Sequence, residues 1–397
     1  MDNKVYVVKC ATYDQVAEKL PELLGMMGGI APFVAAGEAI MLKVNLLMSA
    51  EPERAITTHP SIVEAMGRMV VAAGAKATVI DSPGGGYDYR ENVLKSIYQK
   101  CGMSAAAQNA GLALNYDNGY QAVSFPEGRL IKHFDIITPL VKANGVINLC
   151  KLKTHTYMGM TGAVKNHFGA IPGQTKAGYH AKLNDTARFA QMLLDLAACV
   201  GSRLSIMDAV IGMEGNGPNS GDPRPIGLLL AATNPLALDL VASEILQLPR
   251  EMNPVLTEAE KQGLQPTRMA DVELIGANIA ELRIADFKFP QTIHPAAGLA
   301  NLNWWQSLLK PLYKPGLTAR PIVKNDRCVG CGVCRQTCPM QAITIEGDGK
   351  KHAHIDDKKC IRCYCCHEMC PRDAIELRPG WVTQLLGQKE TPAQKSL

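Results

Sequence analysis

A repeated cysteine motif near the carboxyl end constrains this chain more than any other feature. The pattern C-x2-C-x2-C-x3-C-P occurs twice, and the two copies, which begin at Cys328 and Cys360, are 32 residues apart. Nine of the 13 cysteines lie between Cys328 and Cys370. A disulfide scaffold would distribute its cysteines along the chain, so this concentration indicates metal ligation instead.

The spacing of each copy suits a [4Fe–4S] cubane. Three thiolates on a tight loop can hold three corners of one cluster, and the fourth, before the proline, reaches the other cluster. Zinc is the alternative, but a zinc site needs four ligands, usually from two separated CxxC pairs. Cys365 would break the x3 spacing to Cys370 and is predicted to be a non-ligand near a cluster. The predicted ligand sets are Cys328, Cys331, Cys334 and Cys370 for one cluster, and Cys360, Cys363, Cys366 and Cys338 for the other.

The first 285 residues alternate strand-like and helix-like stretches. Hydrophobic residues make up 47% of the chain and charged residues 20%, as in ordinary globular proteins. Strands alternating with helices favour an α/β domain with a mainly parallel sheet. Strands are predicted at 39–46, 77–81, 145–149, 204–210 and 226–233, and helices at 59–74, 185–201 and 235–246.

We therefore expect an α/β domain (1–285), a linker with a short helix (286–320), a small α+β ferredoxin-like domain (321–380) and a polar tail (381–397). The net charge of +4 gives no reason to expect nucleic-acid binding. The strongest apolar run, Ile226 to Ala232, is too short to span a bilayer, and the amino terminus lacks a secretory signal. A cytoplasmic location follows as an expectation.

Residues 136–184, the acid-free segment, contain no Asp or Glu but six lysines and three histidines. A buried strand precedes several of these residues, and ligands of open α/β sheets bind where strands end. A solvated basic loop is the simpler alternative, but we favour a pocket for an anionic substrate or cofactor, such as a phosphate or carboxylate. The candidate catalytic residues are Lys153, His155, Lys165 and His180. The candidate cofactor-binding residues are Lys43, Asn45, Lys151 and Asn166.

Two other loops are weaker candidates, namely Ser82 to Gly86 and Glu214 to Pro218. Glycine-rich turns of this kind arise from turn chemistry about as often as from function. The acid-free segment contains no Walker loop, and Gly84 to Gly86 lack the G-x-G-x-x-G spacing of a dinucleotide-binding loop.

These features resemble domain-of-unknown-function family 362, whose members often carry a ferredoxin module. The matching segments include Lys43-Val-Asn45, Asp81 to Gly84, Asn148 to His155, Gly162 to Asn166, Glu214 to Pro218, and Asn234-Pro235 with Asp239. The cysteine repeat resembles bacterial two-cluster ferredoxins, which implies electron transfer. The acid-free segment is loosely similar in residue type to nickel-pincer lactate racemases.

Three functions remain open from the sequence. The leading hypothesis is an iron–sulfur oxidoreductase with a redox partner protein and a substrate or further cofactor near Lys151 to His180. In it, the basic groups neutralise negative charge, and a histidine such as His155 or His180 supplies protons. The second is a non-enzymatic electron carrier or maturation scaffold that docks to a partner enzyme. The third is a racemase- or isomerase-like enzyme.

Overall fold

The computed structural model describes residues 2–173, 175–290 and 318–380. Within these ranges the α/β domain contains a nine-stranded mixed sheet with the order β11-β1-β10-β9-β7-β2-β3-β4, and β8 pairs with β7. Strands β9, β7, β2, β3 and β4 run parallel to one another, whereas β10 is antiparallel to both β9 and β1, and β8 is antiparallel to β7. The mainly parallel α/β sheet predicted from the sequence is confirmed.

The strands of this domain are β1 Lys4–Lys9, β2 Ala39–Lys43, β3 Lys76–Ile80, β4 Ala113–Leu114, β5 Tyr120–Ser124, β6 His133–Ile137, β7 Gly145–His155, β8 Gly159–Thr161, β9 Leu204–Asn216, β10 Ser220–Ala232 and β11 Glu273–Ile275. Strands β5 and β6 form a separate hairpin.

The α-helices are α1 Val16–Gly25, α2 Pro60–Ala72, α3 Glu91–Lys100, α4 Met103–Ala110, α5 Thr138–Val141, α6 Ala163–Asn166, α7 Thr175–Lys182, α8 Thr186–Val200, α9 Pro235–Ile245, α10 Pro254–Lys261 and α11 Ile279–Leu282.

Local signals explain where the predicted helices begin and end. The Asp185 side chain accepts hydrogen bonds from Ala187 N and Arg188 N at the start of α8, and Gly201 ends that helix in the left-handed conformation. Asn234 caps α9 in the same way, and Pro235 occupies its first turn. These caps place the boundaries of α8 and α9 within one residue of the sequence prediction.

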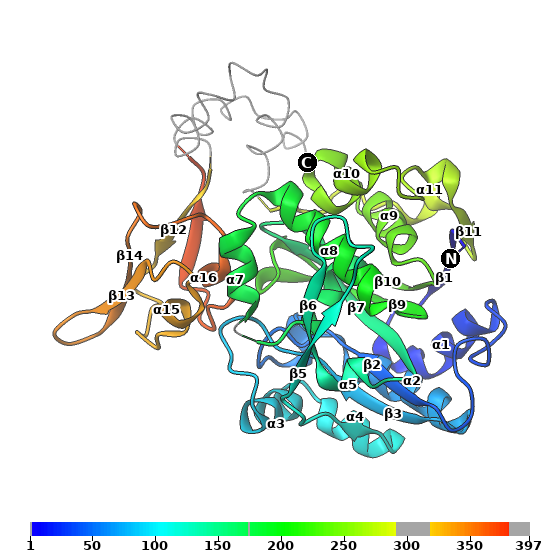
Figure 1. The fold of residues 1–397 in the computed structure, drawn as a ribbon. Coiled ribbons are helices and arrows are strands. Elements are labelled where there is room, and N and C mark those ends of the chain that lie inside the picture. Colours follow the sequence, from blue (N-terminus) through cyan, green and yellow to red (C-terminus); the bar gives the residue numbers. More distant parts are fainter. Residues whose placement is uncertain (1, 174, 291–317, 381–397) are drawn as a thin grey trace.

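Helices cover both faces of the sheet (Figure 1). Apolar residues of α1–α4 pack with Ile40, Leu42, Ile147 and Leu149 on one face. The alternate residues Cys150 and Leu152 pack against α9, and Met41 and Val146 pack against α8, on the other face. The core is therefore a three-layer arrangement, with the strand ends left to form a site.

Strand β7 is longer than predicted. The sequence predicts a strand that ends at Leu149, but the strand continues to His155 because β8 folds back and pairs with it at Lys153, Thr154 and His155. Every residue of β7 is buried. Lysines expected on a loop therefore belong to the interior of the sheet.

The cluster domain (residues 321–380) contains β12 Arg320–Val323, α15 Val333–Thr337, β13 Ile343–Glu346, β14 His352–Ile355, α16 Cys365–Glu368 and β15 Ile375–Arg378. Strand β12 pairs with β15, and β13 pairs with β14. The predicted helix of the linker and the predicted tail fall mostly on residues 291–317 and 381–397, outside the described residues. None of the described helices is both long and apolar enough to cross a bilayer.

Candidate functional site

The eight predicted ligand cysteines surround two cavities. One cavity is lined by Cys328, Cys331, Cys334 and Cys370, and the other by Cys338, Cys360, Cys363 and Cys366. Each cavity thus joins three cysteines of one repeat to the last cysteine of the other repeat. A cubane cluster needs four thiolates, and two-cluster ferredoxins supply them in this crossed arrangement, so the residues present fit two [4Fe–4S] clusters.

Cys365 lies between the second cavity and the α/β domain. Its side chain is buried, and it lines both the cavity of Cys338, Cys360, Cys363 and Cys366 and a separate pocket, which we call the interdomain pocket. The pocket encloses about 70 Å³ between the two domains. One turn of helix α16 therefore lies between a cluster cavity and the interdomain pocket and contributes side chains to both.

The α/β domain builds its side of the pocket from strand ends. Lys43 ends β2 opposite Ile80, which ends the parallel strand β3, so Asp81 follows close to Lys43. The Lys43 ammonium lies 2.8 Å from Asp81 Oδ1, and Asp81 Oδ2 accepts a hydrogen bond from Leu46 N at 2.7 Å. A Cβ at Gly169 would lie 1.8 Å from Asp81 Oδ1, so the buried ion pair requires glycine at that position.

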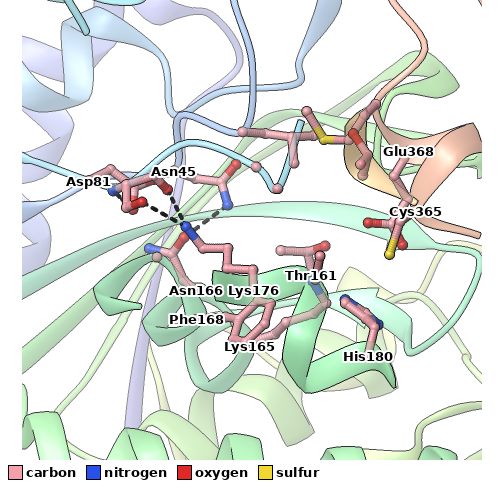
Figure 2. A pocket seen from close by; sticks show the side chains of 18 residues that line it. Asn45, Asp81, Thr161, Lys165, Asn166, Phe168, Lys176, His180, Cys365 and Glu368 are labelled. Carbon is pink, nitrogen blue, oxygen red and sulfur yellow. Dashed lines mark hydrogen bonds between the residues drawn. The ribbon is translucent and has the colours of Figure 1, made fainter. Parts of the chain in front are cut away.

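Helix α6 presents two of the predicted residues, Lys165 and Asn166, to the pocket. Asp239 fixes the start of this helix, because its carboxylate accepts hydrogen bonds from Ala163 N at 2.5 Å and Val164 N at 3.0 Å. Asn166 Oδ1 in turn accepts a hydrogen bond from Asn45 Nδ2 at 2.9 Å (Figure 2). The short helix is therefore held in place from both sides.

Helix α7 adds Lys176 and His180 to the pocket. The Lys176 ammonium donates to Ser82 O, Ser82 Oγ and Pro83 O at 2.9, 2.9 and 2.7 Å. Burial lowers the pKa of Lys176 to about 7 and that of His180 to about 3. His180 is consequently neutral at physiological pH, whereas the pKa of Lys176 is close to physiological pH, so this lysine is partly protonated there.

The structure divides the eight candidates of the α/β domain into two groups. Asn45, Lys165, Asn166 and His180 line the interdomain pocket, and Lys43, Lys151, Lys153 and His155 do not. Lys153 Nζ donates to Asn45 Oδ1 and Ile56 O, so it supports a pocket residue from behind. Lys151 lies elsewhere, between Asp208 Oδ2 at 2.8 Å and the Tyr13 hydroxyl at 2.7 Å.

His155 faces the cluster domain. Its Nδ1 accepts hydrogen bonds from Tyr157 N and Met158 N at 3.1 and 3.2 Å, so the proton of the neutral ring is on Nε2. That nitrogen lies 3.3 Å from Glu368 Oε1, but the two atoms make no hydrogen bond. Burial holds the pKa of His155 well below its usual range, and Lys165, His180 and Lys153 reinforce the effect. His155 is therefore a neutral neighbour of Glu368, and its Nδ1 already accepts two backbone hydrogen bonds.

The sequence prediction missed the residues that the cluster domain contributes. Glu368 lines the pocket, and burial raises its pKa while Lys165 and Lys153 lower it. Cys365, Met369 and Thr337 line it as well. Lys176 was signalled by the acid-free segment, but nothing in the local sequence indicated that Glu368 would meet that segment.

The two weaker candidate segments form part of the surface on which the cluster domain docks, and Glu214 to Asn216 of the second segment belong to the end of β9. A Cβ at Gly84 would lie 2.4 Å from Met369 Sδ, and one at Gly86 would lie 2.5 Å from Thr337 Oγ1. After Glu214 to Pro218, Asn219 Nδ2 donates to Cys370 O at 2.8 Å. His367 Nε2 lies 3.3 Å from Asn216 O. Both loops therefore contact the cluster domain.

Comparisons with known proteins give a separate match for each of the two parts of the chain. Residues 40–244 match the domain of unknown function DUF362, and residues 321–377 match a 4Fe-4S dicluster domain. The thylakoid-associated protein sll1697 of Synechocystis sp. is 34% identical over 304 residues, which are 74% of this chain and 90% of that protein.

A solved structure, the lactate racemase apoprotein of Thermoanaerobacterium thermosaccharolyticum, aligns with a TM-score of 0.38 and 10% identity. It covers 60% of this chain, and the chain spans 56% of that protein. This match gives the racemase hypothesis no support. The 4Fe-4S dicluster domain supports a role in electron transfer. The match over residues 40–244 shows that the chain belongs to the DUF362 family.

Proposed function

We propose that this chain is an iron–sulfur oxidoreductase that moves electrons through two [4Fe–4S] clusters to or from a small anionic molecule in the interdomain pocket. One observation carries the proposal: Cys365 lines both the pocket and the cavity of Cys338, Cys360, Cys363 and Cys366. A ligand in the pocket would be separated from that cavity by little more than one side chain. Each cluster, when bound, takes up or releases one electron at a time.

The crossed cysteine sets would hold the clusters, and backbone N–H groups would tune them. Ala342 N, Ala353 N and Ala374 N donate to the sulfurs of Cys338, Cys328 and Cys370 at 3.3, 3.4 and 3.2 Å. Such bonds stabilise the more negative, reduced state. The residues of the chain thus favour acceptance of electrons at both cavities.

The pocket is suited to a ligand that gains negative charge. In the reducing direction, two electrons from a redox partner protein and two protons from water would reduce one ligand molecule by two electrons. Lys165 and Lys176 line the pocket and would neutralise the charge while the protons arrive.

A carrier or scaffold without catalysis is the second candidate. Cys331 is exposed, and the neighbouring Val329 is 50% exposed at the rim of the first cavity. An exposed ligand beside an exposed apolar side chain suits electron exchange with a partner protein. In that case the interdomain pocket would have no redox role.

Anaerobic purification followed by iron, sulfide and spin analysis tests the proposal. About eight irons and eight sulfides per chain are expected, with two coupled paramagnetic centres after reduction. The reduced protein is then mixed with a set of small anions while the visible absorbance is followed. Reoxidation by a specific anion supports the oxidoreductase, and reoxidation by protein acceptors alone supports the carrier. Zinc in place of iron would reject both.

The cytoplasmic location stays a prediction. The relative from Synechocystis sp. is named as thylakoid-associated, so association with a membrane surface is a reasonable alternative for this chain. Fractionation of native cells into membrane and soluble pools, with and without a high-salt wash, distinguishes the two.

A further inference from the structure

Buried polar groups around the interdomain pocket lack partners. Thr161 Oγ1 and His180 Nδ1 make no hydrogen bond among the described residues, although these side chains are only 3% and 6% exposed. Within the same described ranges, the Lys165 ammonium has neither a hydrogen bond nor an ion pair, and its nearest aromatic contact is the Phe168 ring, whose centroid lies 6.0 Å away. Glu368 Oε1, which lines the same pocket, is also buried and without a hydrogen bond, whereas Lys165 is partly buried. Buried polar atoms are almost always satisfied, so these unsatisfied groups around one cavity indicate a polar ligand.

The charges around the pocket indicate that this ligand carries one negative charge. The Lys43 ammonium is already paired with Asp81, and Lys176 directs its three protons to Ser82 and Pro83. Of the lysines at the pocket, Lys165 is thus the one whose ammonium is available to bind an anion. Among the described residues, Lys165 gives the pocket one ammonium without a partner, which one negative charge on the ligand would match.

The volume of the pocket limits the ligand to a few atoms. One water-sized group needs roughly 10–15 Å³, so the pocket of about 70 Å³ accommodates on the order of five to seven non-hydrogen atoms. Flavins and nucleotides are far larger, since their sites measure roughly 300–1,000 Å³. Leu47, Phe168, Ala177 and Met369 give the pocket an apolar wall, which inorganic phosphate would not use.

We propose that the interdomain pocket binds a short-chain monocarboxylate of about two to four carbons. The carboxylate accepts hydrogen bonds from Lys165 Nζ, Thr161 Oγ1 and the neutral His180 ring, and the alkyl end points toward Cys365 and Met369. In Figure 2 the first three residues gather at the α/β side, and Cys365 and Glu368 descend from α16. This inference rests on the proposed function, of which it names the substrate class.

Isothermal titration of the full-length, iron-loaded protein under argon tests the proposal. The probes are acetate, propionate, butyrate and hexanoate, with propionamide as the uncharged analogue and inorganic phosphate as the dianion. We expect binding of propionate or butyrate, at least tenfold weaker binding of hexanoate, and none of propionamide or phosphate.

Lys165→Met should weaken carboxylate binding roughly 10- to 150-fold, because a charge-assisted hydrogen bond is lost. Thr161→Val should have a smaller effect, and Lys165→Arg should retain part of the affinity. Lys142→Met is the matched control, since Lys142 is an exposed lysine of the same acid-free segment. Equal iron content and equal circular dichroism show that each variant is folded.

Two results would overturn the inference: tighter binding of phosphate than of any carboxylate, or carboxylate binding that Lys165→Met leaves unchanged. Iron content and reducibility are measured on the same samples. Protein that holds its clusters and accepts electrons but binds no carboxylate rejects this inference alone. Protein without iron rejects the proposed function as well.

Discussion

Lys176 should control how anion binding depends on pH. Burial lowers its pKa to about 7, and Lys43 and Lys165 reinforce the effect while Asp81 opposes it. A bound anion favours the protonated lysine. The affinity for an anion should therefore be greatest below pH 7 and should decrease above it, by up to tenfold for each pH unit. His180, whose pKa burial lowers to about 3, cannot produce this dependence. Titration calorimetry with propionate between pH 6 and 9 measures it.

The control for this prediction is Lys176→Met, which should bind propionate more weakly and with little dependence on pH. If the pH dependence persists in that variant, the titrating group is another one, and Lys165, whose pKa burial also lowers, is the next candidate.

Single residues also show what residue type alone does not reveal about a site. Lys43, Lys151 and Lys153 are each fully or almost fully buried, and the sequence marks them correctly as unusual. Their partners are Asp81, Asp208 and Asn45, which come from other strands and loops. In the acid-free segment, Lys151 thus takes its counter-charge from Asp208 on β9, and Lys153 takes neutral oxygen partners from the loop after β2. No local sequence pattern distinguishes a lysine that has a partner within the protein from a lysine that is available to bind a ligand.

At the scale of elements, α16 determines which cysteines belong to which cluster. It places Cys366 in the second cluster cavity, and it places Cys365 between that cavity and the pocket. We therefore expect Cys338→Ala to reduce the iron content from about eight to about four per chain while the other cluster is kept. Cys365→Ala should retain about eight irons. Iron analysis and electron paramagnetic resonance of anaerobically purified variants check both.

An iron content near four in the Cys365→Ala variant would show that Cys365, not Cys366, is a ligand. Loss of all iron in the Cys338→Ala variant would leave the crossed sets untested by this route, so Cys370→Ala is prepared in parallel. The two variants should lose different clusters and give different residual spectra.

The elements that the sequence predicted best are those with local signals. Cysteine spacing, the Asp185 and Asn234 caps and the Gly201 stop each act within a few residues. The true length of β7 depends instead on its pairing with β8, and the polar residues Lys151, Lys153 and His155 hid the strand pattern. Burial of these side chains inside the sheet is a tertiary effect that periodicity does not reveal.

At the scale of the whole molecule, the pocket exists because two domains meet. The domain order was predictable from composition and motifs, but the pocket was not, since Glu368, Met369 and Thr337 belong to the cluster domain. Met369 enters an apolar cluster with Met48, Ile56 and Met213 of the α/β domain. Close packing between the two domains depends on the absence of side chains at Gly84 and Gly86. In the sequence, these glycines are equally typical of an ordinary turn.

Substitution at Gly86 should separate cluster binding from pocket formation. A Cβ there would lie 2.5 Å from Thr337 Oγ1 and 3.0 Å from Val333 Cγ1, so Gly86→Ala must shift these side chains, and we expect the cluster domain that carries them to move away from the pocket. All eight predicted cluster ligands lie within that domain, so iron content should stay near eight per chain. Carboxylate affinity should fall at least tenfold because the pocket loses one wall. Hydrogen exchange should rise in α15, α16 and the loop of residues 82–86.

Gly25→Ala is the matched control, because a Cβ at Gly25 meets nothing within 4 Å and lies in α1, away from the interface. It should leave iron content, affinity and exchange unchanged. If Gly86→Ala bound carboxylates as tightly as the parent protein, the pocket would not depend on the docked cluster domain. Cys365 would then have no place between cluster and ligand, and electron transfer across the interface would lose its structural basis.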